Sequence, residues 1–359
     1  MNQTPARPPP QPAPATRQRF LAEFLDAFDR RTFLLVIAVL LIQAGFVLSY
    51  AGAFHHPSPH RVPIAVAAPA QISGHLVSEL NAIGGQPLYA TAVAGQATGR
   101  TLLRHGTASG LLIINPRAST DTLQVAGGGG AATATAVQDI IARTEAAQHR
   151  HATVTDAVPA QPGDARGLPG FYLVVGWLAG GYLAAALLGI ATRPRPATTR
   201  RAIIRLIMLV PYAILSGLAG AIIAGPVLGA LTGHLIAISA LGALIIYCAA
   251  TVTMGFQVLL GTFGVGLTLI LFVVLGNPSA GGAYPPPLLP AFWRTISPAL
   301  PNGAGAQALR HIIYFGSYDI TGNLTIIAAY ILTAITVTIT GTSLLARRAA
   351  TGKTAPAVP

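Results

Sequence analysis

The sequence predicts an α-helical integral membrane protein with about six transmembrane helices and an inserted extracytoplasmic α/β domain. Of the 359 residues, 52% are hydrophobic and only 9% are charged, and the mean hydropathy is +0.60. A water-soluble globule of this length carries far more charge. The apolar residues also fall into long runs, and a stretch of lower hydropathy, residues 55–170, separates the first run from the others.

The amino-terminal region precedes the first apolar run in two parts. Residues 1–16 are polar and rich in proline, so we expect a disordered tail. In residues 17–31, apolar side chains such as Phe20 and Phe24 recur at helical spacing, with charged side chains opposite them. This pattern predicts an amphipathic interfacial helix, lying on the membrane surface or against a partner.

The first predicted transmembrane helix covers residues 33–54. This run contains no charged residue and is long enough to cross a hydrocarbon core of about 30 Å. Arg30 and Arg31 precede it and favour a cytoplasmic start. A cleaved signal peptide is the alternative, because Ala51-Gly52-Ala53 resembles a processing site, but the apolar run is longer than the core of a typical signal peptide.

Residues 55–170 have the pattern of a compact extracytoplasmic α/β domain. Short apolar segments alternate with segments of helical periodicity. The expected strands cover 62–68, 87–94, 110–116 and 121–127, and the expected helices cover 71–83, 96–105 and 131–148. Four glycines, residues 127–130, precede the last helix, and we interpret them as a flexible turn rather than a phosphate cradle.

Residues 171–348 are predicted to form a five-helix transmembrane region, followed by a cytoplasmic tail at 349–359. The expected spans cover 171–192, 203–224, 235–253, 257–275 and 324–345. Only Met254-Gly255-Phe256 separates the fourth span of the chain from the fifth, so we expect a tight apolar turn there. Small residues such as Gly181 and Gly217 favour close helix packing within a bundle or a dimer.

The positions of the basic residues predict the orientation. The formal charge is +12, and of the 22 Lys and Arg residues five precede the first span, five follow the second and three follow the last. Because basic residues in short segments stay in the cytoplasm, both termini are expected there and residues 55–170 outside it. The chain is then a multi-pass protein of the cell (plasma) membrane. The charge is a topology signal, and we expect no nucleic-acid partner.

The expected spans carry no ionisable groups of the kind that drive coupled transport. All ten acidic residues lie outside them, which argues against a proton- or sodium-coupled transporter. The single Gly-Lys-Thr, at 352–354, lacks the first glycine and the preceding strand of a phosphate loop. We therefore expect no enzyme activity, no cofactor and no metal in this chain. His55, His56 and His60 are the alternative for a metal, but their spacing matches no common site.

The segment from 276 to 316 is rich in proline and stands between the last two spans. Two short apolar helices are expected at 288–296 and 303–314, and neither is long enough to cross a membrane. We predict an outer re-entrant segment over 288–314, with an ordinary proline-rich loop as the alternative. Its candidate functional residues are Phe292, Trp293, Pro298, Pro301 and Arg310.

Several short motifs along the chain point to a known family. They are Ile64-Ala65-Val66, Pro162-Gly163-Asp164 with Gly167, Gly276-Asn277-Pro278, and Leu300-Pro301-Asn302-Gly303 with Leu309-Arg310. Together with the order of the spans and the large outer domain, they make residues 20–348 resemble type-2 ABC exporter permeases. The resemblance is particularly to the phage-infection-protein (YhgE/Pip) branch.

This resemblance implies the membrane permease subunit of an ATP-driven exporter, paired in a homodimer or heterodimer and working with a separate ABC-type ATPase. The substrate would be hydrophobic or envelope-associated. The expected docking residues for the ATPase are Arg193, Arg195, Arg200 and Arg201. These arginines are explained equally well as a topology signal. The alternative function is a non-transporting envelope protein whose outer domain binds a partner or a surface ligand.

Overall fold

The computed structural model describes residues 30–351 together with Glu23. The expected tail at 1–16 and nearly all of the expected amphipathic helix at 17–31 lie outside the described residues, as do residues 352–359 of the expected carboxyl-terminal tail. Arg30 and Arg31, assigned to the amphipathic helix from the sequence, instead begin the first long helix.

Within the described residues, five helices are long and apolar enough to cross a membrane, which indicates a multi-pass membrane protein. They are α2 (Arg30–Phe54), α6 (Leu168–Thr192), α7 (Thr199–Ile222, extended by a π-helical turn over Ile223–Val227), α8 (Leu235–Leu260) and α13 (Thr321–Thr351). A sixth apolar helical stretch, Phe263–Ser279, is shorter. It consists of α9 (Phe263–Leu269), a π-helical segment (Ile270–Gly276) and α10 (Asn277–Ser279).

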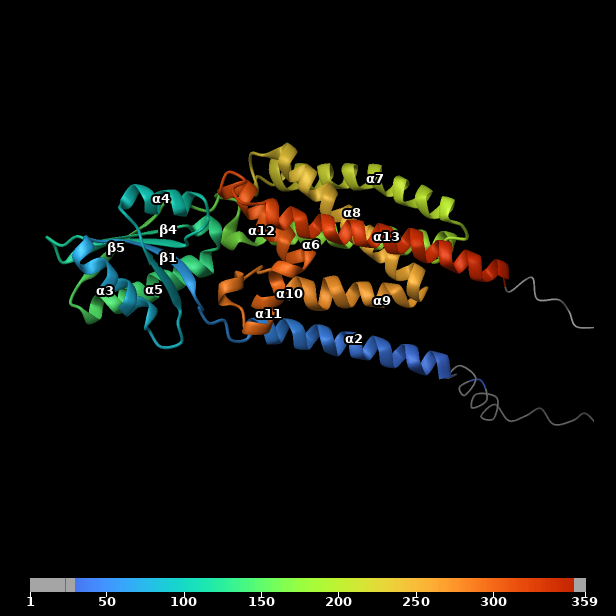
Figure 1. Ribbon diagram of the computed structural model, residues 1–359, viewed down its shortest axis with the longest axis horizontal. Helices are drawn as coiled ribbons and strands as arrows, with labels where there is room; N and C mark the ends of the chain where they lie inside the picture. The colour runs from blue at the N-terminus through green and yellow to red at the C-terminus, as the bar shows by residue number, and fades with distance from the viewer. Residues whose placement is uncertain (1–22, 24–29, 352–359) are drawn as a thin grey trace, which may run out of the picture. The chain divides into compact units, whose positions relative to one another are not determined.

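The α/β domain that the sequence predicts is present between α2 and α6 (Figure 1). Its mixed sheet has the strand order β2-β1-β3-β4-β5. Only β3 and β4 pair antiparallel, with Leu112 opposite Leu123; the other neighbours are parallel. The strands are β1 (Val62–Ala67), β2 (Leu88–Ala92), β3 (Gly110–Ile113), β4 (Thr120–Val125) and β5 (His151–Asp156).

Helices cover both faces of this sheet because β1 is apolar on both sides. The helices are α3 (Ala70–Asn81), α4 (Gln96–Arg104) and α5 (Ala131–Ala147). Ile64 and its same-face neighbours pack against Leu80 of α3 and Ile141 of α5. Ala65, on the opposite face, packs against Leu103 of α4. A central parallel strand that is buried on both faces is typical of α/β domains, and this burial fixes the register of the sheet.

The expected strands and helices of this domain agree with the observed ones to within a few residues, but β5 is missing from the expectation. β5 is an edge strand in which every side chain except that of Ala152 is exposed. Its sequence, HATVTD, alternates polar residues with only two apolar ones, Ala152 and Val154, so its apolar signal for a strand is weak.

The helical region packs around α8, which has buried residues along most of its length. Glycines allow α6 and α7 to approach it closely. A Cβ at Gly181 of α6 would lie 2.3 Å from the Ile246 carbonyl oxygen, and one at Gly217 of α7 would lie 2.6 Å from the Ala243 nitrogen. The sequence-based expectation of close packing through these two glycines is confirmed within the bundle.

The turn expected at Met254-Gly255-Phe256 is wrong. These residues continue α8, which ends at Leu260. The chain reverses at Gly261, whose φ of +65° suits a residue without a side chain. The three residues offered no helix-breaking signal beyond one glycine, and a single glycine is tolerated in an apolar membrane helix.

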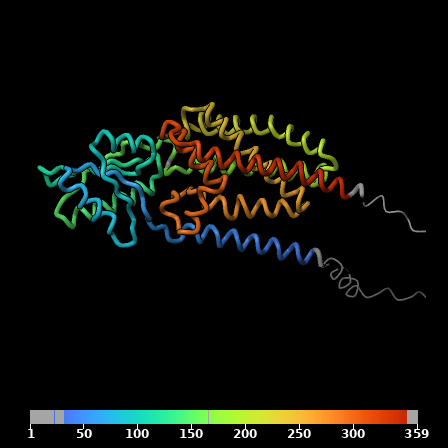
Figure 2. The backbone as a smooth tube through the Cα atoms, viewed as in Figure 1, coloured from blue at the N-terminus to red at the C-terminus, as the bar shows by residue number. Residues whose placement is uncertain are grey.

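From this turn, residues 263–279 run back toward the α/β domain (Figure 2). The α/β domain and the arginine-bearing turn 193–198 lie at opposite ends of α6, α7 and α8 (Figure 1). The chain then forms two short helices, α11 (Ala291–Ile296) and α12 (Pro301–Tyr314), before α13. They lie where the sequence predicts two short helices.

The close contact at Gly217 gives a stability prediction. We expect Gly217→Ala to destabilise the folded protein by about 1–3 kcal/mol, because the added methyl group meets the backbone of α8 rather than a movable side chain. Gly176→Ala is the matched control, since a Cβ at Gly176 of α6 has no atom within 4 Å. The melting temperature of the purified protein in detergent measures both. Equal stability of the two variants would contradict this packing.

Candidate functional site

A buried polar junction joins the α/β domain to the helices at the end of α6 nearest that domain. The Tyr314 hydroxyl, at the end of α12, donates a hydrogen bond to Oδ2 of Asp164. The backbone N–H of Gln161 donates to the Tyr314 oxygen at 3.3 Å. Asp164 is only 2% exposed, and its Oδ1 has no hydrogen-bond partner among the described residues.

Burial controls the ionisation of this junction. It raises the pKa of Asp164, although the Tyr314 hydrogen bond and the positive charge of Arg310 partly oppose that rise. Burial and the Asp164 carboxylate also raise the pKa of Tyr314, which therefore keeps its proton and acts as a donor. The arrangement is a buried carboxyl group that can gain a proton more easily than an exposed aspartate.

A second contact fixes the chain just before α6. The Gln161 side chain accepts a hydrogen bond from the Thr232 N–H at 2.6 Å, and its amide donates to the Thr232 carbonyl at 3.0 Å. Gly163 lies directly against the turn that precedes α8, because a Cβ there would be 2.3 Å from the Gly229 carbonyl oxygen. The link from the α/β domain to α6 is thereby attached to the α7–α8 connection.

A third contact, between amide side chains, attaches α12 to the 263–279 stretch. Asn302 donates through Nδ2 to the Phe272 carbonyl at 2.9 Å and to Oδ1 of Asn277 at 2.8 Å. Asn302 is 1% exposed. A Cβ at Gly276 would lie 2.2 Å from the Asn302 Oδ1, so a glycine is needed for this approach.

These contacts involve residues from three of the short motifs noted in the sequence, and the bond between Asn302 and Asn277 joins two of them. Asp164 belongs to the Pro162-Gly163-Asp164 motif, Asn277 to Gly276-Asn277-Pro278, and Asn302 to Leu300-Pro301-Asn302-Gly303. The sequence alone does not predict these pairs, because the bonded residues are far apart in the chain and the periodicity of a single helix or strand does not relate them.

The residues proposed for the outer segment have different environments. Phe292 of α11 is 57% exposed, whereas Trp293 is 9% exposed and packs against Ala53 and Leu289. Pro298 lies in a 3-10 turn, and Pro301 is the first residue of α12. Arg310 of α12 donates to the Gln307 side chain at 3.2 Å and to the Gly281 carbonyl at 3.4 Å. The re-entrant character of the segment stays a prediction.

The arginines at the opposite end of the helices fall into two groups. Arg195 donates to the carbonyl groups of Val258 and Leu259, at 3.0 and 2.9 Å, and so caps the end of α8. Arg193, Arg200 and Arg201 have exposed side chains, for which no hydrogen bond or ion pair is found within the described residues. These three remain available to a partner.

Arg205, absent from the sequence-based candidates, has a clear structural role. Its guanidinium donates to the carbonyls of Thr192 and Arg193, both at 3.1 Å, where α6 ends. A positive side chain at a helix carboxyl terminus satisfies carbonyls that have no partner inside the helix. Sequence spacing alone could not distinguish this arginine from its neighbours.

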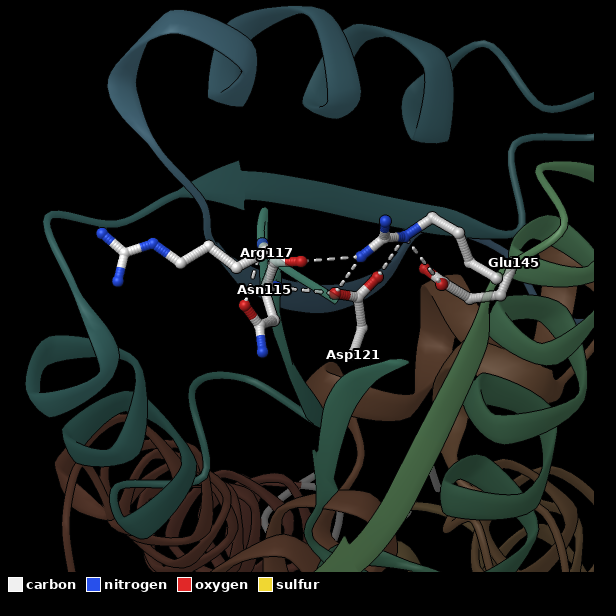
Figure 3. Close-up of polar contacts among 5 residues, drawn as sticks. Asn115, Arg117, Asp121 and Glu145 are labelled. Atoms are coloured by element: carbon white, nitrogen blue, oxygen red, sulfur yellow. Dashed lines mark hydrogen bonds and ion pairs between the residues drawn. The ribbon is translucent and has the colours of Figure 1, made fainter. Parts of the chain in front are cut away.

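A separate charged cluster lies within the α/β domain (Figure 3). Arg150 donates to both oxygens of Asp121, at 2.8 and 2.7 Å, and to the Asn115 carbonyl at 3.0 Å. Glu145 Oε2 lies 3.7 Å from the Arg150 Nε. Asp121 is fully buried and Glu145 is 4% exposed. Two carboxyl groups therefore share one guanidinium in a site with little access to water.

The two carboxyl groups of this cluster respond to burial in opposite ways. Burial alone would raise the pKa of Asp121, but hydrogen bonds from Arg150 and Asn115 outweigh it and lower that pKa. Burial and the adjacent Asp121 raise the pKa of Glu145 to about 7. Glu145 thus holds a proton in the folded protein at pH values where an unfolded glutamate has lost it. The cluster has a structural role, because the paired Arg150 and Asp121 connect the turn at Asn115 to strand β4.

This proton predicts a fall in stability as the pH rises. Since the unfolded pKa is 4.5 and the folded one about 7, the folded state binds more protons between these values and loses up to about 3 kcal/mol of stability across them. We expect Glu145→Gln, which keeps the neutral shape, to remove most of this loss. Melting temperatures from pH 5 to 8 in detergent test it. Parallel pH profiles for the wild type and the variant would refute the assignment.

Two further features of the sequence are the three histidines and the run of glycines. Among the residues that the structure describes, no group of three or more His, Cys, Asp or Glu side chains is placed to hold a metal ion, so His55, His56 and His60 form no metal site there. The glycine run forms a 3-10 turn at Gly127–Gly129 before α5. Its Gly127 N–H bonds to Asp156 Oδ1 at 3.0 Å.

No protein-family profile, curated protein or solved structure matches this chain.

Proposed function

We propose that the chain is the permease subunit of an ATP-driven exporter that works with a separate ABC-type ATPase. The observation that carries this proposal is the contrast between the two ends of one helical bundle. One end presents the side chains of Arg193, Arg200 and Arg201 without partners among the described residues, and the other is joined to an α/β domain through a buried polar junction. The helices between them contain no acidic residue, so the driving energy must come from a partner.

In this proposal residues 263–279 form the sixth crossing. The stretch is apolar, it begins beside the arginine-capped end of α8, and it reaches the Asn302 contact near the α/β domain. At about 1.5 Å per residue, the stretch is slightly shorter than a typical transmembrane helix. A short transmembrane helix is accommodated by local thinning of the bilayer or by polar side chains at its ends. Six crossings put both termini in the cytoplasm and the α/β domain outside the cell membrane.

The mechanism that we propose transmits movement along rigid helices. An ATPase bound at the exposed arginines would displace the ends of α6, α7 and α8 together, because Arg205 of α7 is bonded to the end of α6 and Arg195 to the end of α8. At the far end, the same helices meet the Asp164–Tyr314 and Gln161–Thr232 contacts. A change at the cytoplasmic end therefore has a continuous route to the outer domain. The substrate is hydrophobic or envelope-associated, and the permease acts as a homodimer or heterodimer.

A non-transporting envelope protein is the second candidate function. The feature that favours it is β5, an edge strand with an unpaired backbone edge and exposed side chains. Such edges accept a strand from a partner protein. In this alternative the helices serve as the membrane anchor of a binding domain.

Purification of the full chain in a mild detergent, with identification of associated proteins by mass spectrometry, distinguishes the two. We expect an ABC-type ATPase to co-purify, and the combined variant Arg193→Gln, Arg200→Gln, Arg201→Gln to reduce its recovery at least tenfold. The matched control replaces Arg104, Arg117 and Arg143, three exposed arginines of the α/β domain, with glutamine. Absence of any ATPase, or equal loss in both variants, would reject the exporter proposal.

A further inference from the structure

A cavity of about 200 Å³ lies where the α4 face of the sheet meets α12 and the proline-rich segment. Its walls come from the turn before α5, from Pro285 to Pro287, and from the side of α12 that carries Gln307, Arg310 and His311. None of its lining residues is acidic. The volume corresponds to about six or seven water molecules. This is enough space for a small polyatomic ion, either free or attached to a larger molecule.

The polar groups on the cavity wall are mostly unused hydrogen-bond donors. Thr133 is 4% exposed, and its hydroxyl has no partner among the described residues. The Gln307 side chain accepts from Arg310 through its oxygen, which leaves its amide N–H groups unused within the described residues. Within the described residues, Arg310 makes only two hydrogen bonds, of 3.2 and 3.4 Å, from a guanidinium with five N–H donors.

Within the described residues, no carboxylate forms an ion pair with Arg310. Asp164 is the acidic group that influences it, but no ion pair within 4.0 Å joins the two in the described part of the chain, and Asp164 is hydrogen-bonded to Tyr314. Burial lowers the pKa of the Arg310 guanidinium, which nevertheless remains charged, as arginine does in proteins. A partly buried cation without a paired anion is costly unless a ligand neutralises it.

The helix that bears Thr133 adds a second source of positive potential. α5 is 17 residues long, begins one residue after Gly130 and has neither a side-chain cap nor an acidic residue in its first turn. Unpaired N–H groups and the helix dipole favour an anion at such an end. Gly129, in the turn before the helix, lines the same cavity.

We propose that this cavity binds a phosphate-type oxyanion, with Arg310, Gln307 and Thr133 as hydrogen-bond donors. A tetrahedral oxyanion offers several acceptor oxygens in different directions, which suits donors that converge from two helices. The half-buried ring of His311 is excluded from this set, because its Nδ1–H donates to the Tyr318 carbonyl at 2.6 Å and the Nε2 of the neutral ring is then an acceptor. Binding here does not depend on whether the protein transports anything.

Two sources supply this chemistry: free inorganic phosphate and the phosphodiester of a lipid headgroup. The test uses the full chain in a neutral detergent and phosphate-free buffer, at constant ionic strength. The melting temperature is measured against inorganic phosphate, against short-chain phosphatidylglycerol, and against short-chain diacylglycerol as the uncharged control. A ligand that binds only the folded state raises the melting temperature in a saturable manner.

We expect a saturable rise with phosphate, phosphatidylglycerol or both, and none with diacylglycerol. Response to phosphate alone identifies the free ion as the ligand, and response to phosphatidylglycerol alone identifies the headgroup. Arg310→Gln should weaken binding at least tenfold. Thr133→Val, which removes the hydroxyl with little change of shape, should weaken it several-fold and keeps the test valid if the arginine variant fails to fold.

Arg294→Gln is the matched control, because Arg294 lies on α11, bonds to the Leu289 carbonyl at 3.0 Å and does not line the cavity. It should bind as the wild type does. The proposal is overturned if the melting temperature shows no saturable rise at ligand concentrations up to about 100 times a millimolar dissociation constant. It is also overturned if diacylglycerol raises the melting temperature equally, or if the Thr133→Val and Arg294→Gln variants bind the ligand alike.

Discussion

The helical region depends on one constraint: carbonyl groups at the ends of membrane helices need hydrogen-bond donors, and lipid supplies none. At the end far from the α/β domain, Arg205 provides donors for the last carbonyls of α6, and Arg195 does so for α8. At the other end, Asn302 donates to the Phe272 carbonyl within the π-helical segment, and Gln161 donates to Thr232. The bundle is therefore held at both ends by side chains with specific partners.

This constraint gives the two ends different chemistry. Guanidinium groups serve one end, which fits a cytoplasmic location under the distribution of basic residues across membranes. At the other end, amides, a tyrosine and the buried carboxyl group of Asp164 connect the helices to the α/β domain, and Arg294 and Arg310 donate to nearby backbone carbonyls. In between, packing depends on small residues such as Gly181 and Gly217, because polar groups there would need partners of their own.

Much of this architecture could be predicted from the sequence, since long apolar runs and strand alternation are strong signals. The first four strands, the three domain helices and α12 follow from them. The α8 reversal could not be located, because Gly255 and Gly261 look alike until φ is known. The junction was hidden for another reason: Gln161 pairs with Thr232 and Asp164 with Tyr314 across long stretches of chain, and only the tertiary fold makes them neighbours.

We propose that the α/β domain and the arginine turn face opposite sides of a membrane that residues 263–279 cross. Single cysteines placed in a Cys248→Ala background test it, at Arg104→Cys, Arg200→Cys, Thr262→Cys and Thr321→Cys. With an impermeant maleimide on intact cells, we predict labelling at 104 and 321, and labelling at 200 and 262 only after permeabilisation. Labelling of 262 and 321 from the same side, or of 104 and 200 from the same side, would contradict the account.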